Sequence, residues 1–398
     1  MREVFSSDCP LDFHRQGFPA LGSKRYFNYG GQGPLPQVAL DAIVAGYAIM
    51  QQKGPFSKQV LDWVTGQMAD TRAAIASELG VSPHTIALTD SVSTGCNIVL
   101  WGLPWQLGDH ILLTDCEHPG IVAAVQELSR RFGVGVDHCI LQTTLNTGDP
   151  VAAIAEAVTP QTRLVVLSHI LWNTGQVLPL ADIVVACRRQ NPNVLLLVDA
   201  AQSVGVLPLD LKTLDIDFYA FTGHKWLCGP DGVGGLYLRP GLEEALSPTF
   251  IGWRGIRTDP TGTPIGWKPD GSKFEVATSA FPLYGGLTAA IGLHTAWGTM
   301  VQRYERICQL SGQLWSHLQA IKGLHCLRTA PPEAGLVSFQ IPGRSQGQCV
   351  QDLEVQQTMV RLIADPNCIR ACVHYLTLET EVEQLADQVA AWVEGQRN

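Results

Sequence analysis

The run NVLLLVDAAQSVG, residues 193–205, contains a continuously apolar stretch at residues 194–198 that leads directly into an aspartate, Asp199. A strand that is apolar on both faces is typical of a parallel sheet covered by helices on both sides. Ligands of such open sheets bind beyond the carboxyl ends of the strands. Asp199 is therefore a candidate to pair with a cationic ring nitrogen, and Gln202 to reach a ring hydroxyl. Capping of the next helix by Asp199 and a solvated amide at Gln202 are the alternatives.

Five further short apolar runs accompany this stretch, at residues 85–90, 110–115, 163–170, 218–223 and 232–240. Amphipathic helical segments lie between them, at residues 67–79, 119–132, 150–158 and 180–190. Apolar strands that alternate with helices predict an α/β fold with a mainly parallel sheet.

The pattern changes along the C-terminal part of the chain. Residues 248–282 are rich in Gly, Pro and Trp and predict an excursion loop. Helical patterns and one short strand then follow, at residues 284–322, 336–342, 346–358 and 379–394. We expect three parts: an N-terminal segment 1–24, a large α/β domain 25–280 and a smaller C-terminal α+β domain 281–398.

The composition narrows the class of protein. The chain has 398 residues, of which 46% are hydrophobic and 16% charged, so a sizeable core is expected. The net charge of −9 argues against nucleic acid or an anionic membrane as the main partner. Eleven cysteines without a CxxC pair or zinc-finger spacing indicate reduced thiols and no metal site.

The compartment is predicted from what the sequence lacks. The first ten residues, MREVFSSDCP, contain no apolar core of a signal peptide. No stretch reaches eighteen apolar residues without a charge or a turn. We therefore expect a cytoplasmic protein.

The stretch FTGHKW, residues 221–226, places a lysine at the end of a predicted strand. A lysine that forms a Schiff base has to be partly desolvated so that its amine is neutral at working pH. The side chains of Thr222 and His224 could hold a phosphate beside it. These neighbours favour a chemical role for Lys225 over that of a solubilising surface lysine.

Two other strand ends carry candidate ligand contacts. In TDSVSTGCN, residues 89–97, Ser93, Thr94 and Gly95 offer hydroxyl and N–H groups at a helix N-terminus, where phosphate binds well. In TDCEHPG, residues 114–120, His118 could stack on a flat ring. Helix capping and a structural histidine are the alternative readings of these motifs.

The order of these motifs, together with IRACVHYLTLETEVEQL at residues 369–385, resembles class V of the fold-type I pyridoxal-phosphate enzymes. This group includes the cysteine desulfurases, and the resemblance runs from about residue 25 to residue 395. It implies the aspartate-aminotransferase-like fold, in which a large domain carries the cofactor.

The resemblance also implies a role for each matching residue. Lys225 would bind the cofactor as a Schiff base, Asp199 would keep its ring nitrogen protonated, and His118 would stack on the ring. These three are the predicted catalytic residues. The other predicted contacts with pyridoxal 5'-phosphate are Ser93, Thr94, Gly95, Ala201, Gln202, Thr222, His224 and Thr278.

The substrate side of the site follows from the same resemblance. Arg370 matches the arginine that binds a substrate carboxylate, and Arg361, Asn173 and Trp253 are further candidates. Thr278 matches a residue that reaches the phosphate of the partner subunit, which implies a homodimer with sites at its interface. The family run H-x-x-N is altered here, because Trp172 stands at the expected place of the asparagine.

The reaction depends on a cysteine loop that this chain shortens. Desulfurases carry a nucleophilic cysteine on a loop before the carboxylate arginine, whereas Cys368 lies two residues before Arg370 and is expected to enter a strand as a core thiol. The motifs also resemble the cystine/cysteine C–S lyase branch, which implies β-elimination to pyruvate, ammonia and a persulfide or sulfide. Arg361 could then bind the second carboxylate of cystine, with packing or an ion pair as its alternative.

Three other activities stay open from the sequence. These are a cysteine desulfurase that yields alanine, another class V activity such as an epimerase or aminotransferase, and a non-catalytic binding module. The resemblance also implies a sulfur acceptor for iron–sulfur cluster assembly as a partner.

Overall fold

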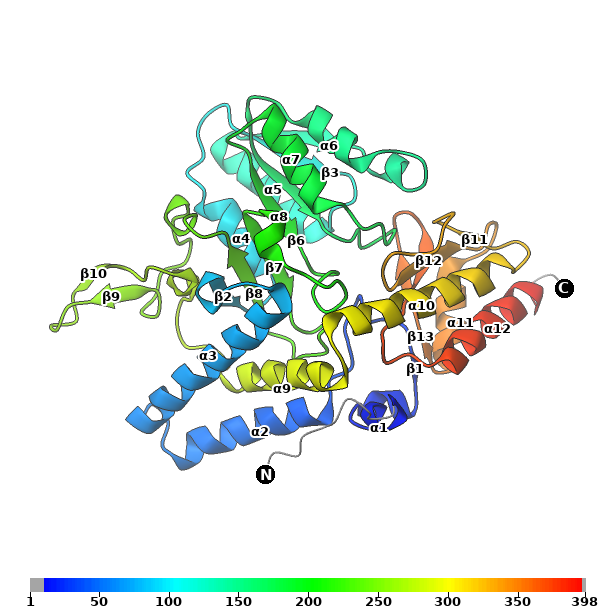
Figure 1. Cartoon of the computed structure of the whole chain (residues 1–398), viewed down its shortest axis with the longest axis horizontal. Helices are drawn as coiled ribbons and strands as arrows, with labels where there is room; N and C mark the ends of the chain where they lie inside the picture. The colour runs from blue at the N-terminus through cyan, green and yellow to red at the C-terminus, as the bar shows by residue number, and fades with distance from the viewer. Residues whose placement is uncertain (1–10, 396–398) are drawn as a thin grey trace.

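The computed structural model describes residues 11–395 of the chain, and a seven-stranded sheet forms its centre (Figure 1). The strand order is β2-β8-β7-β6-β5-β3-β4. The strands are β2 Ile86–Thr89, β3 His110–Thr114, β4 Gly135–Cys139, β5 Thr162–Ser168, β6 Leu195–Asp199, β7 Phe218–Thr222 and β8 Gly234–Leu238. All neighbours from β7 to β4 are parallel, and β8 is antiparallel to β2 and β7. The predicted mainly parallel sheet is confirmed.

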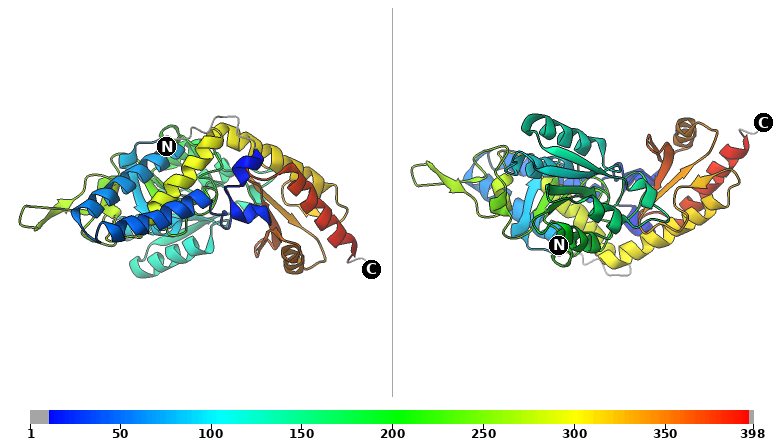
Figure 2. Two further views of the ribbon diagram at one scale, coloured as in Figure 1. Left: turned by 90° about the horizontal axis from the view of Figure 1, so that it is seen from below. Right: turned by 90° about the horizontal axis from the view of Figure 1, so that it is seen from above.

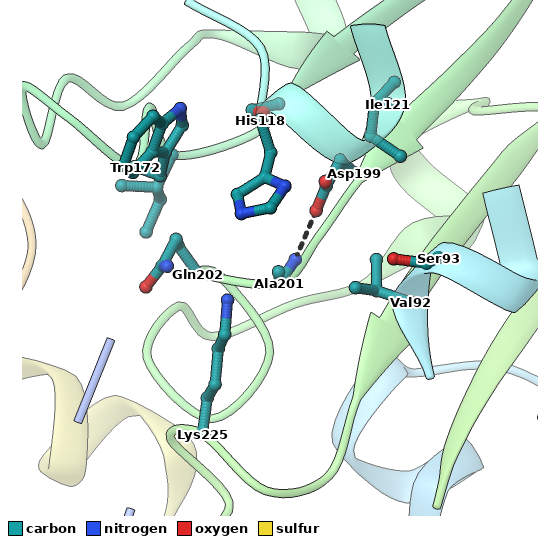
Figure 3. Close-up of a pocket in the computed structure, with 11 residues that line it drawn as sticks. Val92, Ser93, His118, Ile121, Trp172, Asp199, Ala201, Gln202 and Lys225 are labelled. Carbon is teal, nitrogen blue, oxygen red and sulfur yellow. Dashed lines mark hydrogen bonds between the residues drawn. The ribbon is translucent and has the colours of Figure 1, made fainter. Parts of the chain in front are cut away.

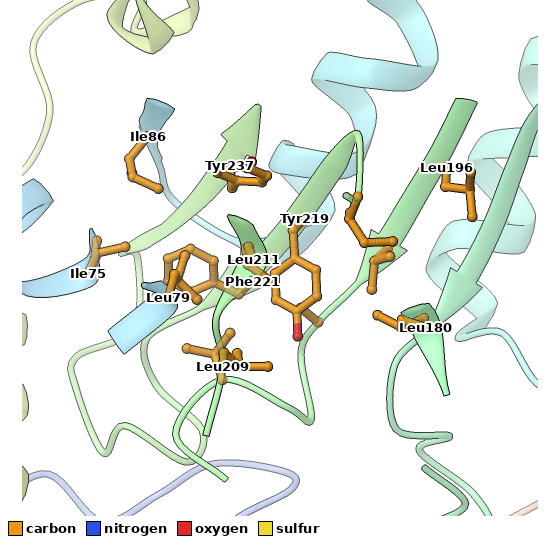
Figure 4. Packing of buried hydrophobic residues seen from close by; sticks show 14 of the residues in the cluster. Ile75, Leu79, Ile86, Leu180, Leu196, Leu209, Leu211, Tyr219, Phe221 and Tyr237 are labelled. Atoms are coloured by element: carbon orange, nitrogen blue, oxygen red, sulfur yellow. The ribbon is translucent and has the colours of Figure 1, made fainter. Parts of the chain in front are cut away.

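Helices cover both faces of this sheet because its central strands are apolar on both sides. In β7, Phe218 and Ala220 face one core, while Tyr219 and Phe221 face the other. The helices α4 Val92–Gly102 and α5 Pro119–Phe132 pack into the first core. The helices α3 Lys58–Leu79, α6 Pro150–Ala157 and α7 Leu180–Gln190 pack into the second, where Figure 4 shows Tyr219 and Phe221 beside Ile75 and Leu79.

A second, antiparallel sheet lies towards the C-terminus, with the order β11-β12-β15-β14. Its strands are β11 His325–Cys326, β12 Leu336–Gln340, β14 Arg361–Ile363 and β15 Cys368–Cys372. Three helices pack into its core: α10 Met300–Gln319, α11 Gln346–Val355 and α12 Glu379–Gly395. The strand predicted at residues 336–342 and the entry of Cys368 into a strand are confirmed.

The start of the described chain is joined to this C-terminal part. The strand β1 Arg25–Tyr26 pairs in parallel with β13 Thr358–Met359. The helix α1 Leu11–Arg15 precedes it, and α2 Gln37–Gln52 packs beside α9 Pro282–Trp297. The domain boundaries at residues 25 and 281 stay a prediction. Residues 1–10, on which the signal-peptide prediction rests, and 396–398 lie outside the described residues.

The segment 248–282 is more regular than the predicted excursion loop. It contains a hairpin of β9 Ile256–Thr258 and β10 Pro264–Trp267, which projects at the opposite end of the molecule from the C-terminus (Figures 1 and 2). The Asp259 carboxylate accepts hydrogen bonds from the N–H groups of Thr261 and Thr263, and Gly262 has a φ of 87°. The DPTG sequence is thus a turn signal, and the loop prediction was wrong at the hairpin.

The remaining elements are short. They are α8 Leu211–Leu214 and the single 3₁₀ turns Pro19–Gly22, Pro83–Thr85, Gln142–Thr144, Glu243–Ala245 and Gly271–Phe274. Within residues 11–395, no helix has the length and apolar character needed to cross a membrane.

Candidate active site

Six strands of the large sheet end at one edge, and the predicted site residues follow five of these ends. The strand β8 is antiparallel to both β2 and β7, so β2 runs in the same direction as the parallel strands. The carboxyl ends of β2, β3, β4, β5, β6 and β7 therefore meet at this edge, where ligands of open α/β sheets bind.

A pocket at this edge brings six of the predicted site residues together (Figure 3). Lys225 extends into it beside Gln202 and towards Asp199. The predicted residues that line it are Ser93, His118, Asp199, Ala201, Gln202 and Lys225. Convergence of a lysine, an aspartate and an imidazole in one pocket fits a catalytic site.

Asp199 presents a buried carboxylate to this pocket. It is the last residue of β6, and its Oδ1 accepts a hydrogen bond of 2.9 Å from the N–H of Ala201. This bond is the turn contact that the capping alternative anticipated, but it uses only part of the acceptor capacity of a carboxylate. The rest is available to a cationic ligand group.

The amine of Lys225 has an unusual pKa for a lysine. Burial lowers the pKa to about 8, the carboxylate of Asp199 raises it, and the guanidinium groups of Arg370 and Arg361 lower it. A lysine with this pKa is neutral in a much larger fraction near physiological pH than an ordinary lysine, and the neutral amine is the form that attacks an aldehyde or accepts a proton.

His118 stands at the N-terminus of α5, next to the pocket. Its Nδ1 accepts a hydrogen bond of 3.2 Å from the N–H of Gly120, so the remaining proton of a neutral ring lies on Nε2. Burial lowers the pKa of His118, and the nearby charge of Lys225 lowers it further. The ring of Trp172 meets the imidazole edge-on at 5.5 Å between centroids.

Gln202 is fixed by two neighbours. Its Oε1 accepts a hydrogen bond of 2.9 Å from the indole Nε1–H of Trp226, and its Nε2 donates one of 2.9 Å to the carbonyl of Gly30. The side chain is therefore held in one orientation beside Lys225 (Figure 3).

The predicted phosphate contacts gather at the start of α4 but do not all face the pocket. Ser93 lines it, whereas the hydroxyl of Thr94 bonds to Asp90 and to Ser91 and lies in a neighbouring cavity. Gly95 allows α4 to approach the sheet, because a Cβ there would lie 2.9 Å from the Cβ of Ala220. The free N–H groups of a helix start suit an anion.

Thr222 and His224 form a separate pair at the end of β7. The Thr222 hydroxyl and the His224 Nδ1 lie 2.7 Å apart and share a hydrogen bond. Burial lowers the pKa of His224, and the charge of Lys225 adds to this. A neutral imidazole beside a hydroxyl can donate hydrogen bonds to a phosphate.

Two predicted residues lie away from the pocket in the single chain. Thr278 is exposed and lines the neighbouring cavity together with Thr94. Trp253 is 50% exposed and stacks on the guanidinium of Arg254. Neither side chain lines the pocket of its own chain, so their predicted roles require a second chain.

Arg370 and Arg361 are cross-strand neighbours on two adjacent strands of the small sheet. They are directly opposed in the β14–β15 pairing, so their side chains leave the same face of the sheet. Arg370 Nη1 donates a hydrogen bond of 2.6 Å to the carbonyl of Trp172. Within the described part of the chain, the buried Arg370 Nε has no partner, which leaves donors for a carboxylate.

Asn173 connects the two sheets. Its Nδ2 donates a hydrogen bond of 3.3 Å to the carbonyl of Asp365, and its own carbonyl accepts one of 2.8 Å from the hydroxyl of Ser338. These contacts hold the small sheet against the strand-end loop of β5. The proposed substrate contact of Asn173 would have to compete with the bond to Asp365.

Sequence reasoning missed two parts of the site. The backbone of Gly30 reaches Gln202, and a methyl group on Gly30 would lie 3.1 Å from Arg370 Nη2. The paired glycines of NYGGQG were a usable signal for such a close approach. Nothing in the local sequence indicates that Glu117 bonds to Ser168 across two strands.

Glu117 is a fully enclosed carboxyl group directly before His118. It accepts hydrogen bonds from the Thr114 hydroxyl at 2.5 Å and from the Ser168 hydroxyl at 2.7 Å. Burial raises its pKa to about 7, and the charge of Asp199 contributes to this. The bonds to Ser168 tie the loop of His118 to the end of β5.

The donor set of the pocket fits pyridoxal phosphate. Asp199 suits a protonated ring nitrogen, and Lys225 suits the aldehyde. Gln202 suits a ring oxygen, and the start of α4 with Ser93 suits the phosphate. Each of these groups has capacity left after its contacts within the chain.

Comparisons with known proteins agree with this fit. The chain is 33% identical over 238 residues to isopenicillin N epimerase of Streptomyces clavuligerus, which covers 60% of this chain and 59% of that enzyme. It is 29% identical over 368 residues to a probable cysteine desulfurase of Xylella fastidiosa strain Temecula1, which covers 90% of this chain and 85% of the relative.

Among solved structures, the complex between the cystine C–S lyase C-DES and its reaction product cysteine persulfide has a TM-score of 0.92. It is 52% identical and covers 94% of this chain and 99% of the other. A C-DES variant with glycine covalently linked to its PLP cofactor has a TM-score of 0.93, at 52% identity, and covers 94% and 98%.

The match to a family settles the predicted class and fold. Residues 25–383 match the family described as aminotransferase class-V, which is 359 of the 398 residues. The fold-type I prediction and the resemblance to class V enzymes are confirmed. The chain belongs to the aminotransferase class-V family.

Proposed function

We propose that this protein is a pyridoxal-phosphate-dependent carbon–sulfur lyase that cleaves L-cystine, and more slowly L-cysteine, by β-elimination. Cystine and water would yield pyruvate, ammonia and cysteine persulfide, and cysteine would yield sulfide in place of the persulfide. The observation that carries this choice over a desulfurase is the burial of Cys368 inside β15.

Cys368 cannot serve as a mobile sulfur acceptor in this position. It is fully buried, and it packs with Leu327 and Ile363. Burial raises the pKa of its thiol to about 12, so the nucleophilic thiolate is rare at neutral pH. Without a protein thiolate to attack the substrate sulfur, elimination is the simpler route.

The cofactor would be held by the residues whose donors fit it. Asp199, Gln202, His118 and Lys225 would contact the ring and aldehyde, and Ser93, Thr222 and His224 the phosphate. When bound, pyridoxal phosphate supplies the electron sink that makes the substrate α-proton acidic.

Lys225 would move the proton in this reaction. Its lowered pKa leaves the amine able to accept the proton from the substrate Cα. His118, whose pKa is lowered by burial, would stay neutral and would not repel the cationic groups around it. Asp199 would balance the positive charge of the ring nitrogen.

Two opposed arginines favour a substrate with two carboxylates. Arg370 would bind the α-carboxylate through a two-point contact. Arg361, directly opposite on β14, would bind the distal carboxylate of cystine. Both guanidinium groups lower the pKa of Lys225 and of His118, which supports their position on the pocket side.

The leaving group also favours cystine. The leaving group is a persulfide anion from cystine and a hydrosulfide anion from cysteine. The conjugate acid of the persulfide is the stronger acid, so the persulfide leaves more readily. The 52% identity to the cystine C–S lyase C-DES supports the same substrate class.

A homodimer would complete the site. Thr278 and Trp253 are exposed in the single chain, and the proposal places them at the phosphate and the substrate of the partner subunit. A cytoplasmic location remains a prediction from the sequence, and delivery of sulfur to iron–sulfur cluster assembly remains one that follows from the resemblance to the family.

Product analysis with cystine and cysteine side by side tests the reaction. The expected products from cystine are pyruvate, ammonia and cysteine persulfide in equal amounts. Cys368→Ser is expected to keep most of the activity. Alanine as the main product, with turnover abolished in Cys368→Ser, would establish the desulfurase alternative instead.

A further inference from the structure

The amide of Gln202 lies between two groups of opposite hydrogen-bonding character. The indole N–H of Trp226 can only donate, and the carbonyl of Gly30 can only accept. Both lie 2.9 Å from the amide, the first at Oε1 and the second at Nε2. Turning the amide over would place an N–H against the indole donor and an oxygen against the carbonyl.

This arrangement decides what Gln202 offers to the pocket. The amide oxygen is occupied by Trp226, and one of the two Nε2–H groups is occupied by Gly30. Gln202 also lines the pocket beside Lys225 (Figure 3). One amide N–H therefore remains free and can donate to an anionic ligand oxygen, whereas the second lone pair of Oε1 can only accept from a donor.

The indole itself has little freedom to move. Trp226 is 1% exposed, and a Cβ on Gly335 would lie 2.7 Å from the indole Cη2. Tyr29 stacks on the indole at 6.1 Å between centroids, and His374 Nε2 lies 3.1 Å from the Trp226 carbonyl. The position of the indole N–H is thus set by the surrounding core.

We propose that Trp226 is a positioning residue, which fixes the Gln202 amide so that its free N–H donates to the ionised ring oxygen of bound pyridoxal phosphate. This inference rests on the proposed function because it requires that cofactor. It adds that the residue directly after Lys225 acts on the cofactor through Gln202.

The expected signature is a change in the proton affinity of the bound cofactor. A hydrogen bond donated to the ring oxygen stabilises its anion, so the cofactor loses its proton at a lower pH. If the donor is lost, the pH midpoint of the cofactor absorbance rises. An acceptor at the same place would have the opposite effect, since it would stabilise the protonated oxygen.

The experiment is a spectrophotometric pH titration of purified holoenzymes without substrate. Trp226→Phe keeps an aromatic ring and removes the N–H. The pH midpoint of its cofactor absorbance is expected to rise by about half to one pH unit, because the shift reflects part of the free energy of a hydrogen bond to a charged group. Gln202→Ala removes the donor outright and is expected to raise the midpoint by at least as much.

The double variant separates positioning from packing. If Trp226 acts through Gln202, adding Trp226→Phe to Gln202→Ala should change the midpoint no further. A direct effect of Trp226 on Lys225 would persist in the double variant and would overturn the proposal. The sign of the Gln202→Ala shift tests the amide orientation even where Trp226→Phe does not fold, because a downward shift would mean an acceptor.

Tyr29→Phe is the matched control. It removes a buried polar atom from the same aromatic stack, and within residues 11–395 the Tyr29 hydroxyl has no hydrogen-bond partner. Its midpoint should equal that of the wild type, and a shift as large as that of Trp226→Phe would overturn the proposal.

The outcomes also separate this inference from the proposed function. A wild-type protein that binds the cofactor but gives alanine refutes the lyase reaction and leaves the positioning role supported if the shifts occur. Unshifted midpoints with pyruvate as product refute only the positioning role. A protein that binds no cofactor refutes both.

Discussion

Asp199 and Asp217 are both buried aspartates of the large sheet, and they lie at its opposite edges. Asp217 directly precedes β7 and is saturated: it accepts hydrogen bonds from Arg188, from Arg239 and, at 2.8 Å, from the N–H of Leu196. Asp199 ends β6 and accepts a single one from the described residues, from Ala201.

The difference distinguishes a structural charge from one reserved for a ligand. Two guanidinium groups neutralise Asp217, so its charge stabilises the fold at the amino ends of the strands. The charge of Asp199 is shared with the amine of Lys225, whose pKa it raises against the effect of burial. Unused acceptor capacity in a buried carboxylate indicates the functional edge.

Asp199→Asn should therefore impair the chemistry while sparing the fold. The amide carries no charge to keep a ring nitrogen protonated, and α-proton exchange is expected to fall roughly 10³-fold. Exchange of the substrate Cα proton in deuterated water measures this, with the unfolding midpoint as the control. Exchange near the wild-type rate would remove Asp199 from the mechanism.

Asp217→Asn should show the reverse pattern. It leaves Arg188 and Arg239 without their shared carboxylate, and the expected loss in free energy of unfolding is about 3 kcal/mol. Urea denaturation measures this loss, while kcat of the folded fraction should stay close to that of the wild type. If the two asparagine variants behaved alike, the distinction between the two edges would fail.

The functional side of this contrast, but not the role of Asp217, could be predicted from the sequence. The apolar runs fixed where the strands end, because burial on both faces leaves a local pattern. Asp199, His118 and Lys225 lie at or just after those ends, so their place in the site can be predicted from the runs alone. Each depends on a single strand and the turn that follows it.

The contacts between distant segments could not be predicted in this way. The β14–β15 register that opposes Arg361 to Arg370 depends on strand pairing. The bonds from Gln202 to Trp226 and Gly30 join residues far apart in the sequence. The hairpin at residues 256–267 was missed because its strands are short and exposed and bury no apolar face.

Arg370→Lys tests whether the functional edge extends to the small sheet. Lysine keeps the charge but cannot make a two-point contact with a carboxylate. The transition-state stabilisation measured by kcat/KM for cystine is therefore expected to fall by about 2–3 kcal/mol. Steady-state kinetics measure this. Arg328→Lys, which alters an arginine paired with Glu333, is the matched control and should leave kcat/KM unchanged. Equal effects of both variants would make Arg370 a structural residue.

Glu117 is a third buried carboxyl group. Like Asp217 it accepts several hydrogen bonds from within the chain, and like Asp199 it is not neutralised by an arginine. Its hydrogen bonds come from Thr114 and Ser168, and no described residue forms an ion pair with it. Asp199 and the thiols of Cys96 and Cys116 are the titratable groups that interact with it. The hydroxyls of Thr114 and Ser168 and the N–H of Ser168 donate to this carboxyl group but do not neutralise a charge on it, so burial favours its protonated form.

Glu117→Gln measures this through the pH dependence of stability. The folded pKa of Glu117, about 7, lies above its ordinary value of 4.5, so the folded state binds the extra proton between these values. The stability that this proton contributes is complete below pH 4.5 and is lost as the pH rises through 7. Glutamine has no proton to lose. The free energy of unfolding of Glu117→Gln relative to wild type should therefore rise by roughly 2–3 kcal/mol from pH 5 to pH 8. A difference that stays constant over this range would show that Glu117 is already ionised at pH 5, and would place its carboxylate with Asp217 among the structural charges.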